Sequence, residues 1–197
     1  MAKFIAAAGL VVLMSILLVT GQALTLEQMA MTWYPEGSRP QPVRIYCKQN
    51  TALNVGTRDN AVVLVTANDL DTSQIWYPVI PPLLPVESAG LKNFSLVNAQ
   101  TYQVMVIPSG STQQVTLTND FDTVKILDQL WTPGTPIRDG FYEIKVANNP
   151  SMTLNGLYGS VHDGTPVGIF PSTPEADNTL WNLTSIFPLG ESMPRGC

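Results

Sequence analysis

The sequence predicts an all-β fold in which a unit of about fifty residues occurs three times. Three tryptophans mark the repeat, because Trp76, Trp131 and Trp181 are 55 and 50 residues apart. A polar pair and an aliphatic residue precede each of them, and two of the three form a Gln-x-Trp triplet. One unit cannot bury its apolar face alone, so three units are expected to close around a shared core. This architecture is the β-trefoil.

Two sets of short segments upstream of the tryptophans predict the strands. They are rich in β-branched and aromatic residues, alternate for much of their length and are bounded by turn residues. The first set is residues 43–47, 94–97 and 141–146; the second set is residues 61–65, 114–117 and 166–170. Turn residues at 58–60, 109–111 and 162–164 precede the strands of the second set.

These segments place the domain at residues 43–187, with repeats at about 43–88, 94–137 and 140–187. A seven-stranded sandwich is the rival fold, but it gives no reason for a threefold tryptophan period. We expect the three indoles to fill equivalent core positions, since large aromatic side chains dominate core burial. The glutamines of the triplets are then expected to bond neighbouring turn backbone, and Asp71 to cap a turn.

Residues 1–23 are predicted to be a cleaved signal peptide. Lys3 is the only charge in this stretch, Phe4 to Val19 is almost entirely apolar, and Gly21-Gln22-Ala23 supplies small residues for cleavage. An uncleaved anchor is the alternative, but a membrane span needs about 20 apolar residues and this run is shorter. We therefore expect a secreted, extracellular protein, with a Pro-rich arm at residues 24–42 and a C-terminal tail at 188–197.

Charge and composition exclude several classes of partner. The formal net charge is −5, and only 13% of the residues are charged. An acidic chain without a basic cluster repels phosphate backbones, so we expect no nucleic-acid partner. After signal cleavage no further membrane-spanning segment is predicted. The composition does not predict an oligomeric state.

The two cysteines, Cys47 and Cys197, allow two interpretations. In an oxidising compartment a pair tends to bridge, and a β-trefoil brings its chain ends together, so a disulfide would fasten the tail to the first strand. Alternatively, Cys47 is a small buried apolar residue and Cys197 is free or paired elsewhere. Secretion would also make Asn93 and Asn182 N-glycosylation sites, because each begins an Asn-x-Ser/Thr sequon.

The ordered set of motifs resembles the ricin-B-like lectins, and more closely their Euonymus-type branch of plant lectins, the EUL domains. The resemblance covers residues 43–187, and the first repeat matches best. The motifs that carry it are Tyr46-Cys47-Lys48, Leu53-Asn54-Val55-Gly56-Thr57-Arg58-Asp59, Gln74-Ile75-Trp76, Phe94-Ser95-Leu96-Val97-Asn98, Leu130-Trp131-Thr132, Leu154-Asn155, Asp163-Gly164-Thr165 and Asn178 to Trp181. The resemblance implies a β-trefoil that binds glycans or glycoproteins without catalysing a reaction.

The resemblance further implies a sugar site in the third repeat. In the family, an Asp after a Leu-Asn pair accepts hydrogen bonds from sugar hydroxyls, an aromatic on the next strand stacks on the ring, and an Asn-Gln pair precedes the last tryptophan. This chain lacks the Asp and has Thr179 in place of the Gln. We expect an altered site made of Asn155, Tyr158, Phe170 and Asn178. The alternative is that Phe170 only packs and Asn178 is a turn residue.

No pattern in the sequence predicts catalysis, a cofactor or a metal site. The single histidine, His162, follows no nucleophile or metal-ligand spacing, and no phosphate-binding glycine loop is present. We therefore do not expect an enzyme. The second functional class is a secreted β-trefoil that has lost sugar binding and acts through protein–protein contacts, for example as an inhibitor, as the Kunitz-type trefoils do.

Overall fold

A computed structural model describes residues 40–80, 93–109, 113–119 and 126–186. The chain divides into two units, Met1–Pro40 and Gln41–Cys197, and the fold below is that of the second unit. The predicted signal peptide, nearly all of the Pro-rich arm and the C-terminal tail lie outside the described residues. Within the described ranges, no helix is long and apolar enough to cross a membrane.

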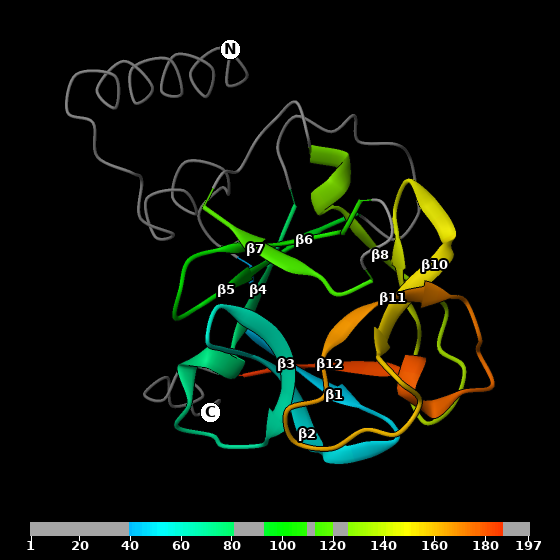
Figure 1. The fold of residues 1–197 in the computed structure, drawn as a ribbon, viewed down its shortest axis with the longest axis horizontal. Helices are drawn as coiled ribbons and strands as arrows, with labels where there is room; N and C mark the ends of the chain where they lie inside the picture. Colours follow the sequence, from blue (N-terminus) through cyan, green and yellow to red (C-terminus); the bar gives the residue numbers. More distant parts are fainter. Residues whose placement is uncertain (1–39, 81–92, 110–112, 120–125, 187–197) are drawn as a thin grey trace, which may run out of the picture. The chain divides into compact units, whose positions relative to one another are not determined.

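Three repeats follow one another along the chain, and each consists of four strands and one short 3-10 helix (Figure 1). The first repeat is β1 (Val43–Cys47), β2 (Asn50–Arg58), β3 (Ala61–Thr66), η1 (Thr72–Gln74) and β4 (Trp76–Val79). The second is β5 (Ser95–Asn98), β6 (Val104–Val106), β7 (Thr116–Thr118), η2 (Ile126–Gln129) and β8 (Trp131–Pro133). The third is β9 (Ile144–Val146), β10 (Asn149–Gly156), β11 (Val167–Pro171), η3 (Asp177–Thr179) and β12 (Trp181–Ser185).

The repeats close into a ring through antiparallel pairs of their first and last strands. β4 pairs with β5, β8 with β9, and β12 with β1, so each repeat is bonded to the next. The middle strands of each repeat form a hairpin: β2–β3, β6–β7 and β10–β11. Six ring strands with three hairpins make a β-trefoil, and the predicted fold class is therefore confirmed.

The strand registers define which residues are equivalent in the three repeats. Cys47, Asn98 and Val146 each pair with the tryptophan of the preceding repeat. Counting back from these residues makes Arg44, Ser95 and Glu143 equivalent, although they differ in charge. Along the hairpins, the registers Tyr46↔Asn54, Val97↔Val104 and Lys145↔Thr153 make Asn54, Val104 and Thr153 equivalent.

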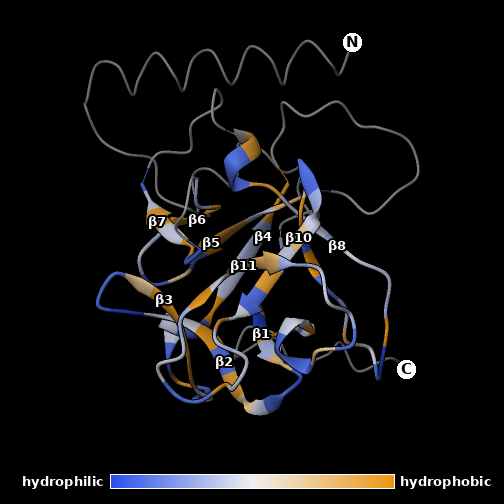
Figure 2. Ribbon diagram, turned by 45° about the vertical axis from the view of Figure 1, so that its right-hand side comes forward, coloured by the Kyte–Doolittle hydropathy of each residue, from blue (hydrophilic) through white to orange (hydrophobic). Residues whose placement is uncertain are grey.

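The core confirms the structural role predicted for the tryptophans. Trp76, Trp131 and Trp181 are each fully buried. The indole Nε1 of Trp76 donates to the carbonyl oxygen of Val55 at 2.8 Å, and that of Trp181 donates to Leu154 at 2.9 Å. Hydrophobic residues follow the strands while polar residues gather in the connections (Figure 2). The first and third tryptophans thus bond their hairpins to the ring strands, whereas Nε1 of Trp131 is buried without a hydrogen-bond partner among the described residues.

Gln74 bonds turn backbone as its triplet predicts. Its Nε2 donates to the carbonyl oxygen of Thr66 at 3.0 Å, and its Oε1 accepts the backbone N–H of Asn68 at 3.0 Å. Asp71 caps η1, because its Oδ1 accepts the backbone N–H of Ser73 at 2.9 Å. A single buried amide therefore holds the loop between β3 and β4.

The two strands of the first hairpin and the two strands of the third hairpin are joined by connections of very different length. Asp59 and Asn60 both adopt left-handed backbone conformations in the two-residue turn between β2 and β3, as a type I′ turn requires. Residues 157–166 connect β10 to β11 and form a much longer loop. This loop is the largest departure of the third hairpin from the first.

Cys47 is fully buried, and the pKa of its thiol is raised because burial disfavours the thiolate. Its Sγ lies 3.9 Å from the carbonyl oxygen of Asp177. Cys197 lies outside the described residues, so the pairing of the two cysteines stays a prediction.

Candidate functional site

Asn155 and Asn178, which the sequence singles out, come into direct contact. Asn155 lies near the end of β10 and Asn178 in the middle of η3. Nδ2 of Asn178 donates to Oδ1 of Asn155 at 3.1 Å and to the carbonyl oxygen of Gly156 at 2.9 Å. The two residues are 4% and 8% exposed, so they form the floor of the site.

The amide pair leaves one donor and one acceptor uncommitted. Within the described part of the chain, neither Nδ2 of Asn155 nor Oδ1 of Asn178 makes a further hydrogen bond. Neither atom is among the fully buried polar atoms that lack a partner, so both retain some solvent contact. A hydroxyl group both donates and accepts, and it therefore matches this pair of atoms.

Phe170 lies on the same face of the hairpin as Asn155. The β10–β11 register pairs Asn155 with Gly168 and Thr153 with Phe170. Residues two apart on a strand share a face, so Phe170 is the diagonal neighbour of Asn155, about 7–8 Å away between backbone positions. Its side chain is 43% exposed. An aromatic ring thus stands beside the amide floor and remains open to solvent.

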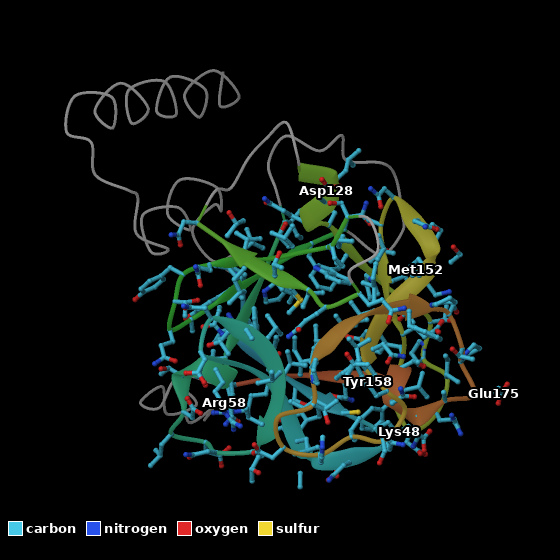
Figure 3. The ribbon with its side chains drawn as sticks, in the orientation of Figure 1. Lys48, Arg58, Asp128, Met152, Tyr158 and Glu175 are labelled. Atoms are coloured by element: carbon cyan, nitrogen blue, oxygen red, sulfur yellow. The ribbon has the colours of Figure 1, made fainter. Side chains whose placement is uncertain are left out.

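Tyr158 lies on the loop that leaves β10, two residues beyond Gly156. It is 84% exposed and adopts φ +69°, and Gly159 after it adopts φ +79°. A tyrosine with a left-handed backbone is uncommon, because its Cβ crowds the neighbouring carbonyl. Figure 3 labels Tyr158 and Lys48, and the residues that follow them are bonded, since Gln49 donates to the carbonyl oxygen of Gly159. Among the described residues Tyr158 makes no direct bond to Asn155 or Asn178, so the structure does not bring it together with the amide pair.

The first repeat has no room for an equivalent of this amide pair. Gly56 corresponds to Asn155, and a Cβ on Gly56 would lie 2.7 Å from Cγ2 of Val65 and 3.3 Å from Cγ of Gln74. In the third repeat, Phe170 is equivalent to Val65 and Thr179 is equivalent to Gln74. Thr179 is shorter than glutamine, and its hydroxyl donates to the carbonyl oxygens of Thr173 and Ala176 at 3.0 and 2.8 Å. Because Thr179 is shorter than the glutamine of the first repeat, it leaves room for the side chain of Asn155.

Gln49 holds the loop of residues 157–166, which carries Tyr158, although no motif in the sequence predicts this role for Gln49. Nε2 of Gln49 donates to the carbonyl oxygen of Gly159 at 2.9 Å, and its Oε1 accepts the backbone N–H of Val161 at 3.0 Å. One amide from the β1–β2 turn thus spans the residues that follow Tyr158. No local pattern marks such a glutamine, because its partners are about a hundred residues away along the chain.

The far end of the same loop is held by Asp163. Its carboxylate accepts the backbone N–H and the hydroxyl of Thr66, both at 2.8 Å, and pairs with Arg58 NH1 at 2.7 Å. The hydrogen bond from Arg58, followed by those from Thr66, holds the pKa of Asp163 far below its usual range. The loop that carries Tyr158 is therefore tied to the first repeat at two places.

The predicted glycosylation residues are both in the described part of the chain. Asn93 is half-buried just before β5, and Ser95 of its sequon is fully buried. Asn182 is half-buried on β12, where its Nδ2 donates to the carbonyl oxygen of Gly140 at 3.3 Å. Their modification stays a prediction. Within the described ranges, no three His, Cys, Asp or Glu residues group as metal ligands.

Comparison with known proteins identifies the family. No family model matches the chain. It is 30% identical to ricin B-like lectin R40G3 of Oryza sativa subsp. japonica over 73% of this chain and 74% of that protein. It is also 30% identical to ricin B-like lectin EULS3 of Arabidopsis thaliana over 72% of this chain, but spans only 46% of that longer protein.

Solved structures agree on the fold. The Macrolepiota procera ricin B-like lectin, solved in complex with lactose, matches 77% of this chain and 100% of its own, with a TM-score of 0.56 and 14% identity. At this identity the likeness shows the fold alone. Fold and relatives together define the class, a β-trefoil protein of the lectin type. The chain belongs to the ricin B-like lectin family.

Proposed function

We propose that this protein is a secreted, non-catalytic lectin that binds glycans through its third repeat. The observation that carries the proposal is the contact between Asn155 and Asn178, which leaves a donor and an acceptor beside the exposed ring of Phe170. Sugar binding in general needs this combination, since sugars present C–H faces to aromatic rings and hydroxyls to converging polar groups. Family membership supports the same function.

Each residue has a defined part in the proposed binding mode. A sugar hydroxyl accepts a hydrogen bond from Nδ2 of Asn155 and donates one to Oδ1 of Asn178. Phe170 stacks on the C–H face of the same ring, and Tyr158 contacts the ligand from the loop with its ring and hydroxyl. The floor is neutral, where the family resemblance implies a carboxylate. Because charge-assisted hydrogen bonds are roughly twice as strong as neutral ones, each site is expected to bind weakly.

The direct test is a glycan array probed with protein made in a secretory host, comparing the unaltered chain with Phe170→Ala and Tyr158→Gly. Glycine accepts the left-handed conformation of position 158, so Tyr158→Gly removes the ring without straining the loop. Leu70→Ala is the matched control, because Leu70 is an exposed apolar residue in the loop of the first repeat. Selective binding that both ring variants lose and the control keeps would support the third-repeat site.

Other outcomes separate the competing functions. Binding that survives both ring variants would move the site to another repeat and leave the lectin function standing. A blank array with folded protein would overturn sugar binding. It would favour the second functional class, a secreted β-trefoil that acts through protein–protein contacts.

Secretion has its own test. The protein recovered from the medium of a secretory host should be heavier than its polypeptide by the glycans on Asn93 and Asn182. After enzymatic deglycosylation its mass should correspond to a chain that begins at Leu24, as cleavage after Ala23 predicts. A product that stays in the cell with Met1 at its start would contradict the proposed signal peptide.

A further inference from the structure

The connection between β5 and β6 breaks the threefold symmetry of the domain. Five residues lie between Asn98 and Val104, whereas six lie between the equivalent Cys47 and Asn54 and six between Val146 and Thr153. The shorter connection carries Tyr102, whose side chain is 58% exposed. The second repeat thus presents an aromatic ring where the equivalent positions, two residues before Asn54 and Thr153, are Ala52 and Ser151.

A buried asparagine builds this turn. Asn98 is fully buried, and its Oδ1 accepts the backbone N–H groups of Gln100 and Thr101, both at 3.1 Å. Its Nδ2 donates to the carbonyl oxygen of Ser73 at 2.8 Å, and the backbone N–H of Tyr102 donates to the Asn98 carbonyl at 2.9 Å. The turn is therefore fixed both internally and against the first repeat.

The backbone of Tyr102 is itself unusual. It adopts φ +58°, and within the described residues only Tyr102 and Tyr158 are tyrosines with a positive φ. The other three non-glycine residues of this kind are Asp59, Asn60 and Asp139, side chains that tolerate the conformation well. A strained, exposed aromatic on a rigid turn is an arrangement that favours binding, because the ring loses little freedom when a ligand arrives.

A second tyrosine lies beside the turn. Tyr77 is half-buried on β4 and pairs with Val97, the residue before Asn98, so it lies next to the strand end from which the turn begins. Burial raises the pKa of Tyr77, and the charge of the Tyr102 phenolate raises it further. The two tyrosines thus lie on adjoining elements at the boundary of the first and second repeats.

The segment that carries the turn is polar but uncharged. No Asp, Glu, Lys, Arg or His occurs between Asn93 and Asn119, and the turn itself reads Ala-Gln-Thr-Tyr-Gln. Amides and hydroxyls next to an aromatic ring suit a neutral sugar. They offer nothing to an anionic polymer, which requires Lys or Arg.

We propose that the turn of residues 99–103 is a second glycan contact, in which Tyr102 stacks on a ring of a neutral sugar chain and Tyr77 extends the aromatic surface. This inference rests on the proposed glycan binding but not on its location in the third repeat. The β5–β6 turn and the β10–β11 loop lie on separate parts of the domain (Figure 1), so one short oligosaccharide does not join them. A polysaccharide can engage both, and the second contact then adds avidity.

The test compares the unaltered protein with Tyr102→Gly, Tyr158→Gly and the double variant. Both positions are left-handed, so glycine keeps both turns, and circular dichroism should show an unchanged fold. Retention is measured on surfaces coated with neutral galactan, xylan, mannan or glucan, with polygalacturonate as the acidic comparison. We expect Tyr102→Gly to weaken retention on the neutral polymer that binds best by about five- to tenfold. Tyr102→Phe should retain binding, because it keeps the ring.

Binding of a short soluble oligosaccharide supplies the second readout. Tyr102→Gly should leave its third-repeat affinity unchanged, whereas Tyr158→Gly should reduce it. If Tyr102→Gly retains the polymer as well as the unaltered protein does, the second contact is refuted while the proposed function stands. If the unaltered protein binds no neutral glycan, both proposals fall. Preferred retention on polygalacturonate would refute the neutral ligand.

Discussion

The loops before Trp76 and Trp181 have the same length and end in the same 3-10 turn, yet they are held by opposite charges. Arg44 under the first loop and Glu143 under the third are equivalent and nearly fully buried. In the first repeat, NH1 of Arg44 donates to Oε1 of Gln74 at 3.2 Å, and NH2 donates to the carbonyl oxygen of Asp69 at 2.9 Å. The two loops thus have similar backbones but surround buried residues of opposite charge.

In the third repeat, residues of the loop before Trp181 donate hydrogen bonds to the buried carboxylate of Glu143. Glu143 accepts hydrogen bonds from the hydroxyl of Ser172 at 2.8 Å and the backbone N–H of Thr173 at 3.2 Å. Nζ of Lys145 lies 3.3 Å from the same carboxylate. The residue two positions before the last tryptophan is therefore not required to reach this carboxylate, so position 179 can be a short threonine.

The contrast shows why loop shape alone does not locate a binding site. In the first repeat every polar atom of the Gln74 amide is engaged: Oε1 by Arg44, Asn54 and Asn68, and Nε2 by Thr66 and Asp71. That amide holds the fold together. In the third repeat the Asn155–Asn178 contact leaves a donor and an acceptor available. The same place in the fold is structural in one repeat and suited to a ligand in another.

Removing the buried cation should have the largest effect. Arg44→Ala deletes a buried side chain and leaves Gln74 without one of its partners, so the free energy of unfolding should fall by about 2–4 kcal/mol. Arg58→Ala is the control, since its pair with Asp163 is exposed to solvent and should contribute little to stability. Urea denaturation measures both. Equal losses would mean that Arg44 does not hold the first loop.

The space argument predicts a coupled effect at Gly56. Gly56→Ala places a Cβ 2.7 Å from Cγ2 of Val65, and overpacking of this kind costs about 1–3 kcal/mol. In a Val65→Ala background the added methyl group has room, so the same substitution should cost clearly less. A double-mutant cycle by denaturation measures the coupling. Additive losses would show that the first repeat does not exclude a side chain at this position.

Restoring the glutamine in the third repeat should convert it toward the first. Thr179→Gln adds a longer side chain where Asn155 now lies, and it should displace the amide floor and lower glycan affinity about tenfold, which corresponds to about 1.4 kcal/mol. Thr179→Ser keeps the hydroxyl bonds to the turn and should bind nearly as well as the unaltered protein. Titration with the best glycan from the array provides the measurement, and improved binding by Thr179→Gln would contradict the proposed geometry.

Much of the fold could be predicted because it depends on side chains that recur. The tryptophan period marks equivalent core positions, and the strands alternate, so the three repeats are visible in the sequence. Asn155, Phe170 and Asn178 were found through the family resemblance, which orders motifs along the chain. Gln49 was not predicted, because its partners are distant along the chain. Tyr102 was not predicted, because its exposure depends on a left-handed backbone that no local pattern specifies. Long-range bonds and strained turns appear only in three dimensions.

The smallest expected effect concerns the long loop of the third hairpin, which lacks the tight turn of the first and depends on Asp163 instead. Asp163→Asn removes the charge that Arg58 and Thr66 bind, and because the pair is well exposed the loss of unfolding free energy at pH 7 should be small. The pKa of Asp163 is lowered in the folded protein, so its contribution is complete above the ordinary aspartate value, about 3.9, and is lost as the pH falls through the folded value. The difference in unfolding free energy between the unaltered protein and the variant should therefore be constant from pH 7 to 5 and shrink on further acidification. A difference that grows in acid would show that the carboxylate does not stabilise the loop through its charge, and the absence of any difference at pH 7 would show that the hydrogen-bonding shape of the side chain is enough.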